Sequence, residues 1–279
     1  MSRSRPFHQL DVFSSTPLYG NPLAVVHDAE GLSDAQMQAL ASWTNLSETT
    51  FLLSPREPGA DYRVRIFTPH AEMQFAGHPT LGSCKAWLAQ GGLPKRAGRV
   101  VQECNIGLVT LRIDGERLAF AAPPCKRSEL AENELDAISH ALGISASDVE
   151  RATLLDNGSE WVGLLLRDAE TVLGLEPDHG ALRMLGKVGV VGPYAAGAPC
   201  QLELRAFAAC QGIPEDPVTG SLNAAVAAWL MDERRVPDHY VAAQGTRLGR
   251  MGRVHVTRAE GEIWVGGEVF VCVTGALTI

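Results

Sequence analysis

A six-residue pattern occurs twice in the sequence, and this repeat constrains the fold more than any other feature. His78 to Ser83 read HPTLGS and Asp216 to Ser221 read DPVTGS, so both copies share x-Pro-x-x-Gly-Ser. The copies are 216 − 78 = 138 residues apart in a chain of 279 residues, close to half its length. An internal repeat of this kind predicts two similar halves.

The segments around the two copies also match. Each copy follows a stretch that alternates like a half-buried strand, YRVRIF at 62–67 and QLELRAF at 201–207. After each copy, apolar residues recur at helical spacing, and Pro79 and Pro217 suit the first turn of a helix. The apolar residues are Leu81, Cys84 and Leu88 in the first helix, which Gly91 and Gly92 end, and Leu222, Ala225, Val226 and Trp229 in the second.

Further elements complete an α+β prediction. Ser33 and Gln36 have the spacing of a capping box, 128–143 reads as a helix with Ser128 as its N-cap, and 108–120 reads as a hairpin with Asp114-Gly115 as its turn. We expect each half to be a mostly antiparallel, barrel-like sheet around one apolar helix. The expected domains are residues 1–122 with a returning strand at 264–279, and residues 123–263, with the active site in the cleft between them.

The composition excludes several classes of partner. The net charge is 24 − 32 = −8 without a basic cluster, which disfavours nucleic acid and anionic membranes. The longest apolar run near a helix, 224–231, is shorter than the roughly 20 residues of a membrane span, and the first residues lack a signal-peptide core. We therefore expect a cytoplasmic protein. The six cysteines show no metal-ligand spacing and are expected to be buried, with Cys210 near the second motif as the exception.

The two predicted helix starts form a natural seat for a carboxylate. The first turn of a helix presents unpaired backbone N–H groups and the positive end of the helix dipole. A substrate carboxylate could bind the main chain around Gly77, His78, Gly220 and Ser221, where glycine allows a close approach. Acid–base side chains beside this seat could then move a proton on the bound substrate.

Four side chains are candidates for that chemistry, and each has a structural alternative. His78 could instead be a turn residue or a capping donor, and Asp216 could be the N-cap of its own helix. Ser221 could bond the helix backbone. Glu48, in NLSETTF at 45–51, could simply cap or solvate the start of a strand, and its local sequence favours that structural reading.

Together these residues give the chain a family resemblance. GNPLAVV at 20–26, NLSETTF at 45–51, RIFTPHAEMQFAGHPTLG at 65–82 and RAFAACQGIPEDPVTGS at 205–221 occur in this order over most of the chain. They resemble the phenazine-biosynthesis PhzF family of isomerase-like proteins, within the diaminopimelate-epimerase-like superfamily.

The resemblance implies a fold, a reaction type and roles for residues. It implies two β-barrel-like domains, each around a central helix, a homodimer, and no cofactor or metal. Glu48 would be the acid–base residue, with His78 and Asp216 as its catalytic partners. The substrate-binding residues would be Asn21, Gly77, Gly220 and Ser221. The reaction known for the family is a proton shift that isomerises a dihydro-hydroxyanthranilate.

Two departures bear on the substrate and the mechanism. The related epimerases use a cysteine at each helix start, and neither hexapeptide here contains one, so racemisation by two thiols is disfavoured. Ala208-Ala209-Cys210 and Asn223 also differ from many relatives near the predicted cleft, which leaves the natural substrate open. We expect a cofactor-independent isomerase of a small, cyclic amino or hydroxy carboxylate. The alternatives are a racemase or epimerase of such an acid, and an inactive carboxylate-binding protein.

Overall fold

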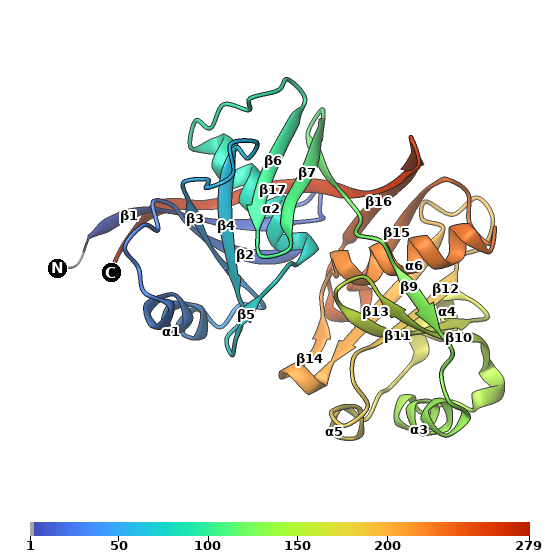
Figure 1. The fold of residues 1–279 in the computed structure, drawn as a ribbon. Coiled ribbons are helices and arrows are strands. Elements are labelled where there is room, and N and C mark those ends of the chain that lie inside the picture. Colours follow the sequence, from blue (N-terminus) through green and yellow to red (C-terminus); the bar gives the residue numbers. More distant parts are fainter. Residues whose placement is uncertain (1–2) are drawn as a thin grey trace. The chain divides into compact units, whose positions relative to one another are not determined.

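The computed structural model describes residues 3–279 and divides into two compact units. Unit 1 contains Met1–Ala121 and Gly266–Ile279, and unit 2 contains Ala122–Val265. Both units combine a strand-rich layer with one buried helix, so the fold class is α+β, as expected (Figure 1). Unit 1 is therefore built from two separate stretches of the chain, while unit 2 is continuous.

Unit 1 is a closed barrel. Its ladder runs from β1 through β2, β3, β4, β6, β7 and β8 to β17, and β17 pairs with both β8 and β1. The β2–β3 and β4–β6 pairs are parallel. The strands are β1 (Ser4–Val12), β2 (Asn21–Val26), β3 (Thr49–Leu53), β4 (Tyr62–Phe67), β6 (Arg99–Cys104), β7 (Gly107–Asp114), β8 (Arg117–Ala121) and β17 (Glu262–Thr278). The short β5 (Glu72–Met73) is paired with β4, and α1 (Asp34–Thr44) begins with the predicted Ser33–Gln36 capping box.

Helix α2 (Gly77–Ala89) fills this barrel and contacts β1, β2 and β8. Its first eight residues are all buried, so this part of the helix has no solvent-exposed face, as expected for a helix enclosed by a barrel. Gly82 shows how close the packing is, because a Cβ there would lie 2.4 Å from a methyl group of Leu23. The helix begins where the sequence predicted, with Pro79 in its first turn.

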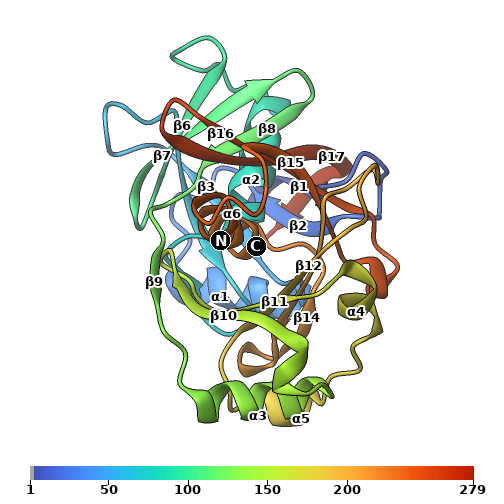
Figure 2. The same cartoon turned by 90° about the vertical axis from the view of Figure 1, so that its right-hand side faces the viewer.

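Unit 2 repeats this plan. The ladder runs β9, β10, β11, β12, β13, β15, β16, with β14 added on β13, and the β11–β12 and β13–β15 pairs are parallel. Its central helix is α6 (Gly220–Asp232). The strands are β9 (Lys126–Ser128), β10 (Val149–Asp156), β11 (Glu160–Leu166), β12 (Val188–Pro193), β13 (Leu202–Ala208), β14 (Ile213–Asp216), β15 (His239–Gln244) and β16 (Gly252–Ala259). The helices α3 (Glu132–Leu142) and α5 (His179–Leu182) pack side by side, and α4 (Ala169–Gly174) contacts β12 (Figure 2).

Each unit contains an arginine–glutamate ion pair, here called its ionic clamp. The two clamps help to show which residues of unit 1 correspond to which residues of unit 2. In unit 1, Arg65 on β4 binds Glu72 on β5 through both carboxylate oxygens, at 2.8 and 2.6 Å. In unit 2, Arg205 on β13 binds Glu215 on β14 in the same way, at 3.0 and 2.8 Å. Each arginine also lies over the ring two residues later, Phe67 or Phe207, at 5.1 and 5.0 Å. These contacts hold the short strand that precedes each central helix, β5 or β14, against the neighbouring strand of the sheet.

The register differs from that of the hexapeptides by five residues. Both helices have 13 residues and begin at glycine, so Gly77 matches Gly220 with an offset of 220 − 77 = 143. The glutamates of the two clamps agree with this offset, because 215 − 72 is also 143, whereas the arginines are 205 − 65 = 140 residues apart. His78 therefore matches Ser221, not Asp216, which lies on β14. The expectation that Pro217 lies in the first turn of the second helix is wrong, since the helix begins three residues later.

A buried glutamine supports the same turn of each central helix. Gln102 on β6 donates to the hydroxyl of Thr80, the fourth residue of α2, at 3.1 Å. Gln244 on β15 accepts from the amide of Asn223, the fourth residue of α6, at 2.9 Å. Asn223 is 1 % exposed, and its contacts with Gln244 and with the Thr219 carbonyl hold the first turns of α6 in place.

Other expectations need correction. Helix α3 begins at Glu132, because Ser128 is taken up by β9, and Ala131 is the N-cap residue. The predicted hairpin is present, but Asp114 pairs with Arg117, so its turn is Gly115-Glu116. Strand β13 is buried on both faces, including Arg205, whereas alternation predicted one exposed face.

The cysteines follow the expectation only in part. Three of them, Cys84, Cys104 and Cys200, are buried. Cys125 is half-buried, while Cys210 and Cys272 are exposed. Cys210 is thus the expected exception, and the exposure of Cys272 on β17 was not anticipated.

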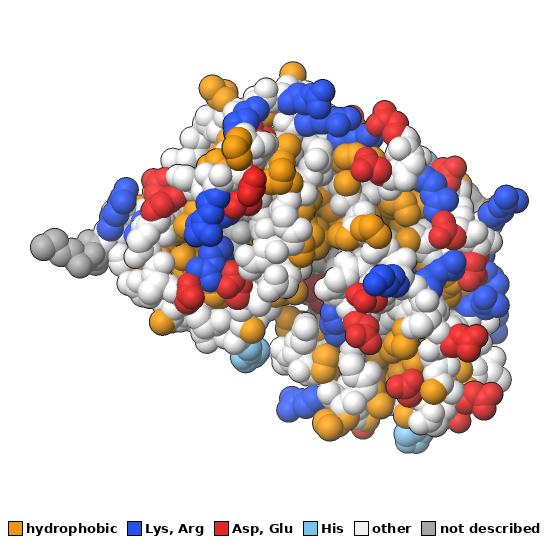
Figure 3. Space-filling view, viewed as in Figure 1, with side chains coloured by type: hydrophobic (Ala, Val, Ile, Leu, Met, Phe, Trp, Pro, Cys, Tyr) orange, Lys and Arg blue, Asp and Glu red, His pale blue; other side chains and the backbone are white. Residues whose placement is uncertain are grey.

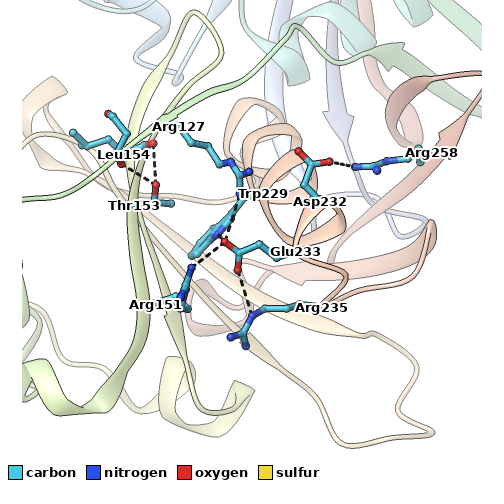
Figure 4. Close-up of polar contacts among 10 residues, drawn as sticks. Arg127, Arg151, Thr153, Leu154, Trp229, Asp232, Glu233, Arg235 and Arg258 are labelled. Carbon is cyan, nitrogen blue, oxygen red and sulfur yellow. Dashed lines mark hydrogen bonds and ion pairs between the residues drawn. The ribbon is translucent and has the colours of Figure 1, made fainter.

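The far end of α6 is held by a cluster of charges (Figure 4). Glu233, the residue after the helix, accepts from the Trp229 indole at 2.9 Å and pairs with Arg151 at 3.3 Å, Arg235 at 3.4 Å and Arg127 at 3.5 Å. Cations are favourable at a helix C-terminus because of the helix dipole. This cluster therefore stabilises the end of α6 opposite to its glycine start.

The visible surface shows no dominant charge. Acidic and basic side chains are interspersed on the face drawn in Figure 3. Within residues 3–279, no helix combines the length and apolar character that crossing a bilayer requires.

Candidate active site

Glu48 and His78 meet in unit 1. Glu48 directly precedes β3, and His78 is the second residue of α2. Glu48 Oε2 and His78 Nε2 are 3.3 Å apart, and the two residues are 9 % and 3 % exposed. The interpretation of Glu48 as a solvated strand start is therefore wrong. A buried carboxylate facing an imidazole is a common arrangement for moving protons.

Asn21 and Ser47 orient the histidine. The Ser47 hydroxyl donates to Asn21 Oδ1 at 3.2 Å, which turns the amide nitrogen of Asn21 toward His78 Nδ1 at 3.4 Å. Nδ1 accepts from Asn21 when the ring proton is on Nε2, so its role in this contact depends on the tautomer of the neutral ring. Sequence analysis named Asn21 for substrate binding only and missed Ser47, whose one signal was its place beside Glu48 in NLSETTF.

Burial keeps His78 uncharged. Loss of hydration lowers the pKa of its imidazole to about 3, and a hydrogen bond with the Pro22 carbonyl opposes this shift only weakly. At neutral pH the ring is therefore a polar, neutral neighbour of Glu48 and can donate or accept a hydrogen bond without forming a buried ion pair.

The starts of both central helices retain main-chain donors. The N-cap residues Ala76 and Thr219 make no side-chain cap to their helices. The first-turn N–H groups of α2, at Gly77 and His78, thus suit an anion, as do those of α6 around Gly220. Gly77, His78 and Gly220 are buried in the described structure.

Asp216 and Ser221 lie together in unit 2. Asp216 accepts from the Thr219 hydroxyl at 2.5 Å, and its backbone carbonyl accepts from Gln244 at 3.1 Å. Asp216 is therefore not the N-cap of α6, since Thr219 has that position. Ser221 Oγ accepts from the Trp161 indole at 3.3 Å, which replaces the expected bond to its own helix backbone.

The predicted residues thus form two groups. Unit 1 brings together Glu48, His78, Asn21 and Gly77, and unit 2 brings together Asp216, Gly220 and Ser221. Each group gathers at the glycine start of its central helix.

Acid should destabilise the fold through His78. Its pKa is about 3 in the folded chain and about 6.5 when unfolded, so below pH 6.5 the unfolded chain binds a proton that the folded chain excludes. We expect this group to reduce the free energy of unfolding by about 1.4 kcal/mol per pH unit between pH 6 and 4. Urea unfolding of wild type and His78→Asn across this range measures the difference in slope. The exposed His70→Asn variant should retain the wild-type slope, and an unchanged slope in His78→Asn would contradict the prediction.

Comparison with known sequences identifies relatives over nearly the whole chain. The profile of the phenazine biosynthesis-like protein family, PhzC-PhzF, matches residues 10–275. Antisense-enhancing sequence 1 of Schizosaccharomyces pombe is 38 % identical over 96 % of this chain and 97 % of its own. The trans-2,3-dihydro-3-hydroxyanthranilate isomerase of Pseudomonas aeruginosa is 35 % identical over 90 % of this chain and 89 % of its own.

Solved structures show the same fold. A PhzF-family protein from Bacillus anthracis superposes with a TM-score of 0.86 at 23 % identity, over 99 % of this chain and 100 % of its own. A hydroxyproline epimerase from Agrobacterium vitis superposes with a TM-score of 0.66 at 14 % identity, over 99 % of this chain and 93 % of its own. The fold is therefore that of the epimerase-like proteins.

Proposed function

Because the chain belongs to the phenazine biosynthesis-like (PhzC-PhzF) family and is an isomerase of that family, we propose that it moves a proton within a small amino or hydroxy carboxylate. The substrate is cyclic, no cofactor takes part, and Glu48 is the general acid and base. The observation that carries the proposal is the buried contact of 3.3 Å between Glu48 Oε2 and His78 Nε2 at the start of α2. The isomerase named among the relatives acts on a dihydro-hydroxyanthranilate, which supports a cyclic substrate.

The proposed reaction needs one proton carrier. The Glu48 carboxylate removes a proton from one ring carbon, and the electron pair of that C–H bond shifts a neighbouring double bond. The same carboxyl group then returns the proton to another carbon, so the product is an isomer and the enzyme is unchanged. The N–H groups at the start of α2 stabilise the negative charge that develops on the substrate during the transfer.

His78 assists by exchanging roles with Glu48. While Glu48 is ionised, the ring donates from Nε2 to the carboxylate. When Glu48 holds the substrate proton, the ring can move its own proton to Nδ1, toward the Pro22 carbonyl, and accept from Glu48 at Nε2. This exchange would let the pair form a hydrogen bond in both states without a charged imidazole.

Two further predictions concern the residues of unit 2 and the oligomeric state. Asp216, Gly220 and Ser221 in unit 2 are proposed to bind polar groups of a substrate. The homodimer stays a prediction, which sedimentation equilibrium would test.

Deuterium incorporation tests the proposed function. The protein would be incubated in deuterated water with cyclic and acyclic amino and hydroxy carboxylates, trans-2,3-dihydro-3-hydroxyanthranilate included, and followed by NMR. Deuterium at a ring carbon together with a moved double bond is the expected result. Deuterium at an α-carbon without bond movement would instead favour a racemase or epimerase. Saturable binding without any exchange would indicate a binding protein.

The epimerase alternative has one observation in its favour, the fold shared with a hydroxyproline epimerase. The corresponding second residues of the two central helices are His78 and Ser221, neither of which is a thiol. An epimerase built on this chain would need another pair of bases, so the isomerase is the better supported proposal.

A further inference from the structure

Lys187 in unit 2 is a half-buried cation without an ionic partner. Its ammonium lies over the Trp161 ring, 4.7 Å from the ring centre, and donates to the Ser159 hydroxyl. Among the residues that the structure describes, no carboxylate lies within 4.0 Å of it, and Cys210, Glu160 and Asp156 raise its pKa only through longer-range electrostatics. Burial lowers the pKa of the Lys187 ammonium. Removing a charge from water without a counter-charge is costly, so this placement needs an explanation.

The strand register places Lys187 beside the start of α6. Strands β11 and β12 are parallel with Val162 opposite Val188, and the Val162 N–H donates to the Lys187 carbonyl at 2.8 Å. Trp161 therefore lies next to Lys187. The indole N–H of Trp161 in turn binds Ser221 Oγ at 3.3 Å, which connects the cation to the second residue of α6 through one side chain.

Asn157 supplies a second, independent sign of a ligand. This residue is 6 % exposed and donates through Nδ2 to the Ser221 carbonyl at 2.9 Å. Because a carbonyl can only accept, the bond fixes the orientation of the Asn157 amide. Its Oδ1 atom is buried and has no hydrogen-bond partner within the described part of the chain. Buried acceptors of this kind are rare and need a donor.

We propose that Lys187, Trp161 and Asn157 form an anion subsite at the start of α6 that selects the substrate. Lys187 pairs with a carboxylate that lies against the first-turn N–H groups of the helix. Asn157 Oδ1 accepts an N–H or O–H group on the neighbouring carbon. The subsite therefore takes an amino or hydroxy acid in preference to a neutral analogue. This inference rests on the proposed function, because its ligand belongs to the substrate class proposed there.

Equilibrium binding tests the subsite without turnover. Isothermal titration calorimetry on the full chain would compare 2-aminobenzoate with its neutral analogue 2-aminobenzamide. We expect wild type to prefer the carboxylate by about tenfold or more, in line with a charge-assisted hydrogen bond. Lys187→Met, which retains packing on Trp161, should lose this preference, and Lys187→Arg should recover part of it. The exposed Lys126→Met variant is the control and should bind as wild type does.

A second pair of ligands tests the role of Asn157. Wild type should bind 2-aminobenzoate more tightly than benzoate, and Asn157→Ala should lose that preference. The proposal is overturned if wild type does not prefer the carboxylate, or if Lys187→Met still prefers it with an unchanged melting temperature. Deuterium exchange by the same wild-type preparation reports on the proposed function separately, so a failure of the subsite and a failure of the isomerase assignment remain distinguishable.

Discussion

Glu48→Gln is expected to lower deuterium incorporation and turnover by about 10³-fold while leaving substrate binding largely intact. An amide of the same shape cannot carry the proton between two substrate carbons. It can still contact His78 Nε2, so the buried pair and the fold should persist. Single-turnover NMR in deuterated water measures the chemical step, and calorimetry with the same substrate measures binding.

The matched control for this variant is Glu116→Gln. Glu116 is an exposed glutamate in the β7–β8 turn of the same unit, and its loss should leave both measurements unchanged. Near-wild-type exchange by Glu48→Gln would show that another group moves the proton. Loss of both binding and the thermal transition would mean that Glu48 supports the structure instead.

Arg205→Met is expected to reduce the free energy of unfolding by about 3–5 kcal/mol. The Arg205 and Glu215 side chains are 4 % and 5 % exposed, so removing the arginine leaves a buried carboxylate without its bidentate partner. Arg205 also donates to the carbonyls of Val172 and Leu175, which would lose that donor. Urea denaturation at pH 7 would measure the change.

The duplication provides an internal control for this loss. Arg65→Met removes the corresponding clamp of unit 1, where the side chains of Arg65 and Glu72 are 19 % and 27 % exposed, and we expect a cost of about 1 kcal/mol. Adding Glu215→Leu to Arg205→Met should recover much of the lost stability, because the uncompensated charge is gone. Equal costs for Arg205→Met and Arg65→Met would contradict the role assigned to burial.

The sequence predicted the duplication and both central helices but aligned them in the wrong register. The hexapeptides matched Pro79 with Pro217, yet one proline lies within its helix and the other precedes its helix. Local spacing cannot distinguish these positions, because proline suits either one. The register depends on Glu72 and Glu215, whose partners are on other strands.

The sequence alone could predict only those parts of the candidate site whose residues lie close together in the chain. Glu48 had no local sign of catalysis and was found by family resemblance, since its contact with His78 joins residues 30 positions apart, 78 − 48. Asn21 and Ser47 are 26 positions apart, and Lys187 has no sequence motif at all. Such contacts arise from strand pairing and helix placement, which no single segment encodes.

The position of β17 near the end of the sequence determines the order in which the two units can complete their folds during translation. This strand pairs with β1 and β8, so the unit 1 barrel cannot close until Gly266–Ile279 have emerged from the ribosome. Unit 2 is continuous in sequence and is complete before that point. The nascent chain must therefore carry an open sheet, with the edges of β1 and β8 unpaired, while unit 2 emerges and folds. Unpaired edges favour association between chains, so the protein is open to aggregation during this interval.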